Sequence, residues 1–197
     1  MAKEGKNGAS ANTPKNILFG AGTIHKGLKY EGEKWNFSES LIGATSGGSK
    51  LTITPEITKV EVDGVYVATK QLQKKTGGTA TMEINLIELT KDIIKAAALA
   101  QDGTSTDTAF DLIEDKPDIE AGDYWENIAF VGLTMEGKQI IAIMDNALCT
   151  SGLSADAKTK EGAVSAYTFE CYADLDADLD GDGDGETLPW HIYYPKE

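Results

Sequence analysis

The sequence predicts a mainly β protein in which one α-helix packs against the sheets. Glycine is frequent, with 21 residues among 197, and it separates short apolar runs of the kind that form strands joined by turns. Apolar residues at helical spacing occur in a single segment. With 41% hydrophobic residues, the chain is long and apolar enough to bury a core. These observations favour a β-sandwich or a partial barrel.

The clearest local signal is a hairpin around Asp63-Gly64, a pair that suits a type I′ turn of two residues. Residues 60–62 and 65–67 flank this pair, and each run has valine at its first and third positions. In this register the four valines share one face, which is expected to be buried. Glu61 then lies on the opposite face, toward solvent.

A second expected hairpin joins residues 128–134 to residues 139–144 through Glu136-Gly137. Both of its strands are apolar at most positions, so both faces are expected to be covered and the hairpin to be central in its sheet. Further strands are expected at residues 79–86 and 164–172, and shorter ones at 16–19, 51–54, 110–113 and 124–127.

One segment has the features of an α-helix. Thr90 is a suitable N-cap, Asp92 lies in the first turn, and an alanine-rich run continues to Ala100. Gly103 lies beyond the expected end of the helix. The small side chains allow the helix to lie close against a sheet or a neighbouring subunit.

The chain is expected to begin with a polar, flexible leader at residues 1–15, followed by a single β-rich domain at residues 16–197. The leader lacks the apolar core of a signal peptide. No run approaches the roughly 18 apolar residues of a membrane-spanning helix. Within the domain, residues 173–186 form an acidic loop with seven carboxylates and no base.

Residues 31–50 form a long connection that holds both glycines and large apolar residues. A connection of this length is uncommon in a compact domain unless it has a function, and its apolar side chains need a cover. A partner surface is the simplest cover, and an additional strand pair is the alternative. The residues in question are Trp35, Phe37, Leu41, Ile42, Gly43, Gly47 and Gly48.

The charge of the chain argues against nucleic acid as a bound partner. The 18 basic residues are all lysine, the acidic residues number 32, and the net charge is −14. Proteins that grip nucleic acid neutralise phosphates with lysine and arginine, and arginine supplies many of the specific contacts. An acidic surface without arginine repels DNA.

No motif for catalysis or cofactor binding is complete. Residues 43–50 have serine where a phosphate-binding loop needs lysine, and residues 20–25 have a histidine at the third glycine of a dinucleotide-binding turn. His25 and His191 are expected to be surface residues rather than metal ligands or bases. Two thiols are expected to be buried, Cys149 and Cys171. The expectation is a protein that is not an enzyme and holds no cofactor.

The acidic loop matches only the first half of a calcium-binding EF-hand loop. Asp176, Asp178 and Asp180 alternate before a glycine, as the cation ligands of such a loop do. Thr187 stands where a bidentate glutamate is required, and no helices flank the loop. The favoured interpretation is a solvated acidic loop or weak cation binding, and no metal site is expected.

Three segments, taken in order, resemble one protein family. They are a Gly-Gly loop at residues 42–50, a hairpin with Asp-Gly at residues 59–64, and a strand at residues 80–90 that ends in Glu-Leu-Thr and leads into the helix. This order and spacing resemble the tail tube (major tail) proteins of long-tailed phages. The resemblance covers residues 16–103, about half of the chain.

The resemblance implies a tail-tube-like β-sandwich or partial barrel with one packed helix and long assembly loops. Six copies would form a ring, and rings would stack into a hollow tube in the virion tail, assembled in the host bacterial cytoplasm. The implied partners are identical copies and other tail proteins, and DNA would pass through the lumen without specific binding. No membrane, metal or cofactor is implied.

The resemblance implies roles for particular residues in two regions. The connection at residues 31–50 would stack one ring on the next, so that deleting residues 43–48 should stop polymerisation. Acids on the solvent faces of inner strands, Glu61 and Glu83, would line the lumen. The alternative function is a calcium-dependent β-sandwich module for binding or adhesion, favoured by the aspartate run and by the aromatic residues Trp190, Tyr193 and Tyr194.

Overall fold

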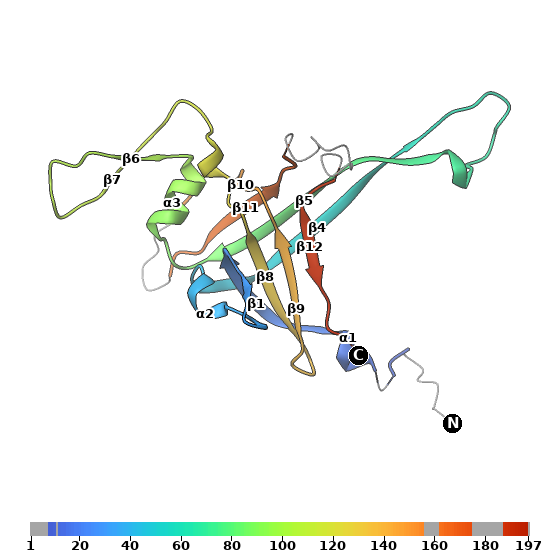
Figure 1. The fold of residues 1–197 in the computed structure, drawn as a ribbon, viewed down its shortest axis with the longest axis horizontal. Helices are drawn as coiled ribbons and strands as arrows, with labels where there is room; N and C mark the ends of the chain where they lie inside the picture. Colours follow the sequence, from blue (N-terminus) through green and yellow to red (C-terminus); the bar gives the residue numbers. More distant parts are fainter. Residues whose placement is uncertain (1–7, 11, 156–161, 175–186, 197) are drawn as a thin grey trace.

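The computed structural model describes residues 8–10, 12–155, 162–174 and 187–196. Within them the protein is mainly β, with several antiparallel sheets and none closed into a barrel, which confirms the predicted fold class. Figure 1 shows a central body from which two hairpins project in opposite directions. Most of the predicted leader and of the acidic loop, including the partial calcium motif, lies outside the described residues.

The first sheet has four strands in the order β1-β8-β9-β12. The predicted hairpin at residues 128–144 forms its centre, and Gly137 has a φ of +79° in the connecting turn, a backbone conformation that glycine adopts without strain. The strands are β1 (Leu18–Lys26), β8 (Ile128–Thr134), β9 (Gln139–Met144) and β12 (Trp190–Tyr193).

The second sheet also has four strands, in the order β10-β11-β5-β4. Its strands are β4 (Thr45–Lys59), β5 (Gln73–Leu86), β10 (Ala147–Cys149) and β11 (Ser165–Cys171). The predicted alternation is confirmed, since every second residue of β5 from Ala80 to Leu86 and of β11 from Ser165 to Cys171 is buried. The buried apolar residues are Ala80, Met82, Ile84, Leu86, Tyr167, Phe169 and Cys171.

The two sheets enclose the main hydrophobic core. The inner face of β5 and β11 packs with Ile24, Ile128 and Met144 of the first sheet, and the Trp125 ring lies 4.6 Å from the Phe169 ring. Both native cysteines are free and buried in this core, as predicted. Desolvation raises the pKa of Cys171 to about 12, so this thiol stays protonated at neutral pH.

The connection at residues 31–50 is not an open loop. It contains part of the strand pair β2 (Tyr30–Glu31) and β3 (Lys34–Trp35), the one-turn helix α2 (Phe37–Ser40) and the start of β4. Trp35 and Phe37 pack on the outer face of β8 and β9, against a cluster formed by Leu28, Ala129, Val131, Ile141 and Ile143. The additional strand pair is therefore the correct alternative, because the apolar cover comes from the same chain.

The predicted helix is α3 (Lys91–Ala98), with the Thr90 side chain accepting a hydrogen bond from the Ile93 amide at its N-terminus. Gly103 lies beyond the end of the helix, as expected. Leu99 adopts the left-handed conformation that closes the helix, and Gly103 lies in a strand. The remaining short elements are α1 (Thr13–Asn16), η1 (Lys70–Leu72), β6 (Gln101–Gly103), β7 (Leu112–Glu114) and η2 (Ala121–Asp123).

The predicted valine face at residues 60–67 is wrong. Strands β4 and β5 continue past the body as one long hairpin, and these valines lie at its exposed end. The turn is present, with the Val65 amide donating to the Val62 carbonyl at 3.1 Å. Of its two central residues only Gly64 has a positive φ, so the turn is not type I′.

The four shorter predicted strands differ from the observed elements, and residues 51–54 lie within the longer strand β4. Of residues 16–19, Asn16 ends α1 and only Leu18 and Phe19 belong to the longer strand β1. Residues 110–113 overlap β7 only at its first two residues. Residues 124–127 form no strand. Instead, Trp125 makes an isolated bridge to Ala147 in which each backbone amide donates to the other residue's carbonyl.

Candidate assembly surfaces

The largest projection is the outer part of the β4–β5 hairpin, residues 56–76, here called the arm (Figure 1). Strand pairing continues out to Lys59 and Gln73, and the Val60 amide then donates to the Leu72 carbonyl at 2.8 Å. At the base of the arm the register shifts by one residue, and such a bulge bends and twists a strand pair. The arm is therefore a hydrogen-bonded hairpin and not an irregular loop.

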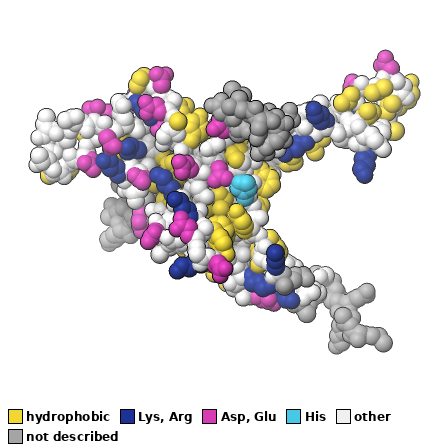
Figure 2. Space-filling model, viewed as in Figure 1, with side chains coloured by type: hydrophobic (Ala, Val, Ile, Leu, Met, Phe, Trp, Pro, Cys, Tyr) yellow, Lys and Arg dark blue, Asp and Glu magenta, His cyan; other side chains and the backbone are white. Residues whose placement is uncertain are grey.

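The end of the arm is apolar and uncovered by the rest of the described chain. Tyr66 is 95% exposed, and Figure 2 shows a group of hydrophobic side chains gathered there. The exposed apolar residues of the arm are Ile57, Val60, Val62, Val65, Tyr66 and Val67. Contiguous exposed apolar groups of this kind mark interaction sites on soluble proteins.

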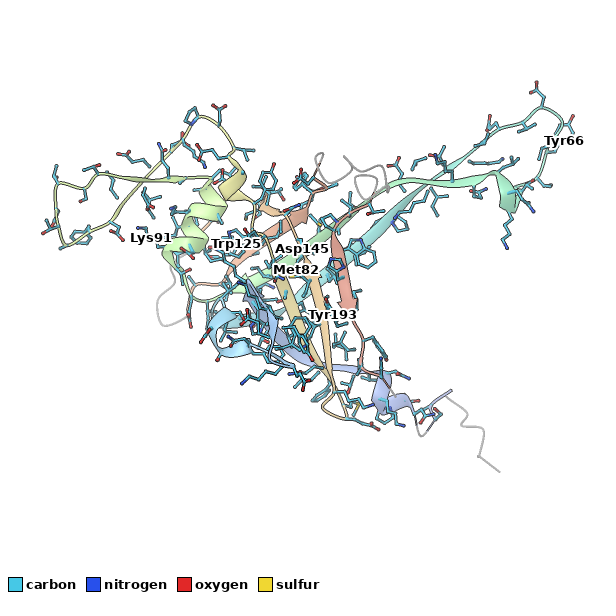
Figure 3. All side chains as sticks on the ribbon, viewed as in Figure 1. Tyr66, Met82, Lys91, Trp125, Asp145 and Tyr193 are labelled. Atoms are coloured by element: carbon cyan, nitrogen blue, oxygen red, sulfur yellow. The ribbon has the colours of Figure 1, made fainter. Side chains whose placement is uncertain are left out.

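A second projection lies at the opposite end of the molecule. Residues 101–123, here called the lobe, contain β6, β7 and η2 and extend beyond α3 (Figure 1). Two lysines form ion pairs with acids of the lobe. Lys91 lies 3.0 Å from Asp102 and 2.9 Å from Asp111, and Lys116 lies 2.6 Å from Asp123. The two pairs of Lys91 link the lobe to α3 (Figure 3), and the pair of Lys116 lies within the lobe.

Two sheet edges are open along the described chain. The outer edge of β4 runs over 15 residues and that of β12 over four, and neither makes a backbone ladder with a further strand there. The other two edges are partly covered, since residues 41–42 bond to β1 and Trp125 bonds to β10. Long open edges pair with other chains unless something blocks them.

The predicted ring-stacking residues do not form one exposed surface. Trp35 and Phe37 pack on the first sheet, and Ile42 packs against the main core. Leu41 is exposed, at 51%. Gly47 and Gly48 lie within β4 at a register shift, and both have φ values above +80°. Gly43 precedes that strand in an extended conformation. The apolar surface that sequence reasoning assigned to residues 31–50 is instead on the arm.

The two predicted lumen acids also lie apart. Glu83 is on the outer face of β5, where Lys50 on β4 approaches it to 3.4 Å. This face is polar and carries threonines on three adjacent strands, at positions 52, 81 and 168. Glu61 is beyond the paired strands on the arm, so its predicted place on a strand face is wrong.

His25 is buried, with 2% exposure, and the prediction of a surface histidine is wrong. Its Nδ1 lies 2.9 Å from the Ser40 hydroxyl, and its Nε2 lies 2.9 Å from the Thr23 hydroxyl. Because Ser40 Oγ donates to the Asn36 carbonyl, it accepts from Nδ1–H, and this fixes one neutral tautomer. Burial lowers the pKa of His25, and a hydrogen bond to the Phe37 backbone offsets part of the effect.

This histidine should make the fold sensitive to acid. In the unfolded chain His25 takes up a proton near its ordinary pKa of 6.5, whereas in the native state it does so only at lower pH. The contribution of His25 to the free energy of unfolding is therefore fully present above this pH and is lost as the pH falls below it. Urea titrations at about pH 7.5 and about pH 5.5 should therefore show that the wild type loses more stability on acidification than His25→Gln does. Equal losses in wild type and His25→Gln would contradict this role.

The described chain holds no group of three or more histidine, cysteine, aspartate or glutamate residues placed to bind a metal ion. His191 lies 3.2 Å from Asp145, whose pKa is raised by burial. The Cys171 thiol donates to the backbone carbonyl of Asp145 at 3.2 Å, so these three residues do not form a nucleophile with a base. No helix among the described residues is long and apolar enough to cross a membrane.

A scan against protein-family models found no matching family, and a search of curated proteins found no matching protein. The geometry of the chain itself therefore carries the functional interpretation.

Proposed function

We propose that this protein is a self-assembling structural subunit of a phage tail tube. Six copies form a ring, and rings stack into a hollow tube in the virion tail, through which DNA passes. Assembly takes place in the host bacterial cytoplasm, and the subunit needs no enzymatic activity or cofactor. Its partners are identical copies and other tail proteins.

The arm is the observation that carries this proposal. Its apolar end, with Tyr66 and the surrounding valines, is uncovered within the described chain and far from the core. Exposing such residues costs free energy in water, and burying their apolar surface in a contact recovers about 25 cal/mol for each Å². A hairpin that holds apolar residues away from its own body is suited to contact another molecule.

The open sheet edges support assembly from identical copies. A ring of subunits removes such edges by pairing each with its neighbour, which an isolated subunit cannot do. The β4 edge is the longer of the two, and it leads directly into the arm. One strand could therefore contribute both a sheet contact and an arm contact.

The charge of the chain supports a conduit for DNA. At a net charge of −14, the protein does not hold phosphates in place. The polar face around Glu83 and the threonines is the best candidate for the lumen wall, since its lysine lies beside a carboxylate. DNA can slide past such a surface without binding.

Negative-stain electron microscopy of the purified protein, with sedimentation velocity, tests the proposal. We expect rings and stacked tubes and a large sedimenting species. A monomer at every concentration would contradict it. A monomer whose melting temperature rises with calcium would favour the calcium-dependent binding module instead.

A further inference from the structure

We infer that the arm of one copy docks on the acidic lobe of the next copy, in a head-to-tail contact. This inference rests on the self-assembly proposed above and adds the two surfaces that meet. The contact joins residues 56–76 of one subunit to residues 101–123 of its neighbour.

A single chain cannot make this contact with itself. The arm and the lobe project from opposite ends of the longest axis of the molecule, with the two sheets between them (Figure 1). The arm is a paired hairpin, so it cannot fold back across the body without breaking its ladder of hydrogen bonds. Contacts between different patches of identical copies propagate, and they close into rings or continue as helical filaments.

The two surfaces have opposite charge. The arm carries four lysines and three acids, a net charge of +1 within a chain of −14. The lobe carries eight acids and one lysine, a net charge of −7. The lysines of the arm are Lys59, Lys70, Lys74 and Lys75, all exposed and in no salt bridge of the described chain. Complementary charge of this kind speeds encounter and selects the partner surface.

Several acids of the lobe are available to such a partner. The ion pairs with α3 and within the lobe use Asp102, Asp111, Glu120 and Asp123. Across the described residues, no lysine lies within salt-bridge distance of the other four acids, which are exposed. These are Asp107, Glu114, Asp115 and Asp118.

The lobe also offers apolar side chains to the end of the arm. Phe110 is 70% exposed, and Leu112 and Ile119 are exposed within the same segment. In the proposed contact, Phe110 of one copy is an aromatic partner for Tyr66 of the next. Leu112 and Ile119 are apolar partners for the valines of the arm. An apolar centre with charged residues around it is the usual composition of a protein interface.

A second exposed apolar patch is a poorer match. It lies where β1 begins and β8 ends, and its residues are Ile17, Leu18, Phe19, Leu133 and Met135. The charged residues within and beside these segments are three lysines, at 15, 138 and 196, and Glu136. A basic arm is repelled by this surface and attracted by the lobe.

Cross-linking tests which surfaces meet. A Tyr66→Cys protein is mixed with a Phe110→Cys protein under assembly conditions and treated with a short bis-maleimide. We expect a heterodimer joined between these two positions, identified by peptide mass spectrometry. The native thiols are buried and give little background. A Leu133→Cys protein, on the other patch, serves as the matched partner. Cross-linking to position 133 but not to position 110 would overturn the inference.

Charge reversal supplies a second test with a rescue. Reversing the arm (Lys59→Glu, Lys74→Glu, Lys75→Glu) gives it a net charge of −5, and reversing the lobe (Asp107→Lys, Glu114→Lys, Asp115→Lys, Asp118→Lys) gives it +1. Either change leaves two surfaces of like charge and should raise the concentration needed for assembly at least about tenfold. Both reversals in one chain should restore assembly.

The matched control for charge reversal changes three exposed lysines elsewhere, Lys15→Glu, Lys29→Glu and Lys34→Glu, and should assemble like the wild type. If the arm-reversed variant assembles at wild-type concentrations, or if the double reversal assembles no better than the single ones, the inference is wrong while the proposed function stands. A wild-type chain that never assembles overturns both.

Discussion

Removing the outer arm should abolish tube formation and leave a folded monomer. The change deletes residues 60–72 and joins Lys59 to Gln73 through Asn-Gly, because these two residues are paired neighbours in the ladder and this turn suits a two-residue hairpin. The deleted apolar side chains make no contact with the core. The free energy of unfolding should therefore change by only about 0.5 kcal/mol. Electron microscopy and sedimentation measure the loss of assembly.

The native thiols report whether the shortened protein is folded. Cys149 and Cys171 are 2% and 3% exposed, and burial raises the pKa of both. They should remain unreactive toward a thiol reagent in the folded variant and react on unfolding. A shortened protein with protected thiols that still forms tubes would show that the arm is not the assembly element. Exposed thiols would show instead that the arm is part of the fold.

Replacing Phe169 with alanine should lower the free energy of unfolding by about 3–5 kcal/mol. The Phe169 ring is 1% exposed, packs beside Trp125, and lies on the inner face of β11 between the two sheets. Truncating it leaves a cavity at the centre of the main core. Urea unfolding, at concentrations where the protein sediments as a monomer, measures the loss without a contribution from assembly.

The same substitution on the lobe is the matched control. Phe110 is 70% exposed, so Phe110→Ala should change stability by about 0.5 kcal/mol or less. Similar losses at the two positions would mean that the two sheets do not enclose the core as the structure has it. The two variants also separate the roles of the residues, since Phe169 acts in the fold and Phe110 in the proposed contact.

Local patterns predicted much of this fold correctly because side-chain direction in a strand follows from position alone. Every second residue of β5 from Ala80 to Leu86 is buried, as the alternation indicates. The hairpin of β8 and β9 is apolar at most positions because one of its faces packs in the main core and the other packs against Trp35 and Phe37. Thr90 caps α3 for an equally local reason, since its side chain accepts from an amide three residues away.

The candidate assembly surfaces were harder to predict, since alternation shows which residues share a face and not what lies against that face. Val60, Val62, Val65 and Val67 have the same pattern as buried strands, yet they sit on an arm that extends past the body. Trp35 and Phe37 are the opposite case, because their pattern suggested exposed side chains. They pack instead against Val131 and its neighbours, about 100 residues away in the chain. Composition did carry one signal, because lysines are concentrated near the valines of the arm and acids in the lobe.

The sequence by itself determined the class of the fold, the positions of the main strands, the helix cap and the burial of both thiols. Each of these depends on periodicity, capping or polarity within a few neighbouring residues. Only the tertiary structure decided that His25 is buried against Ser40, that Trp35 is covered by its own sheet and that the arm and the lobe lie at opposite ends of the molecule. These features depend on contacts between segments far apart in the chain, and local sequence patterns do not specify such contacts.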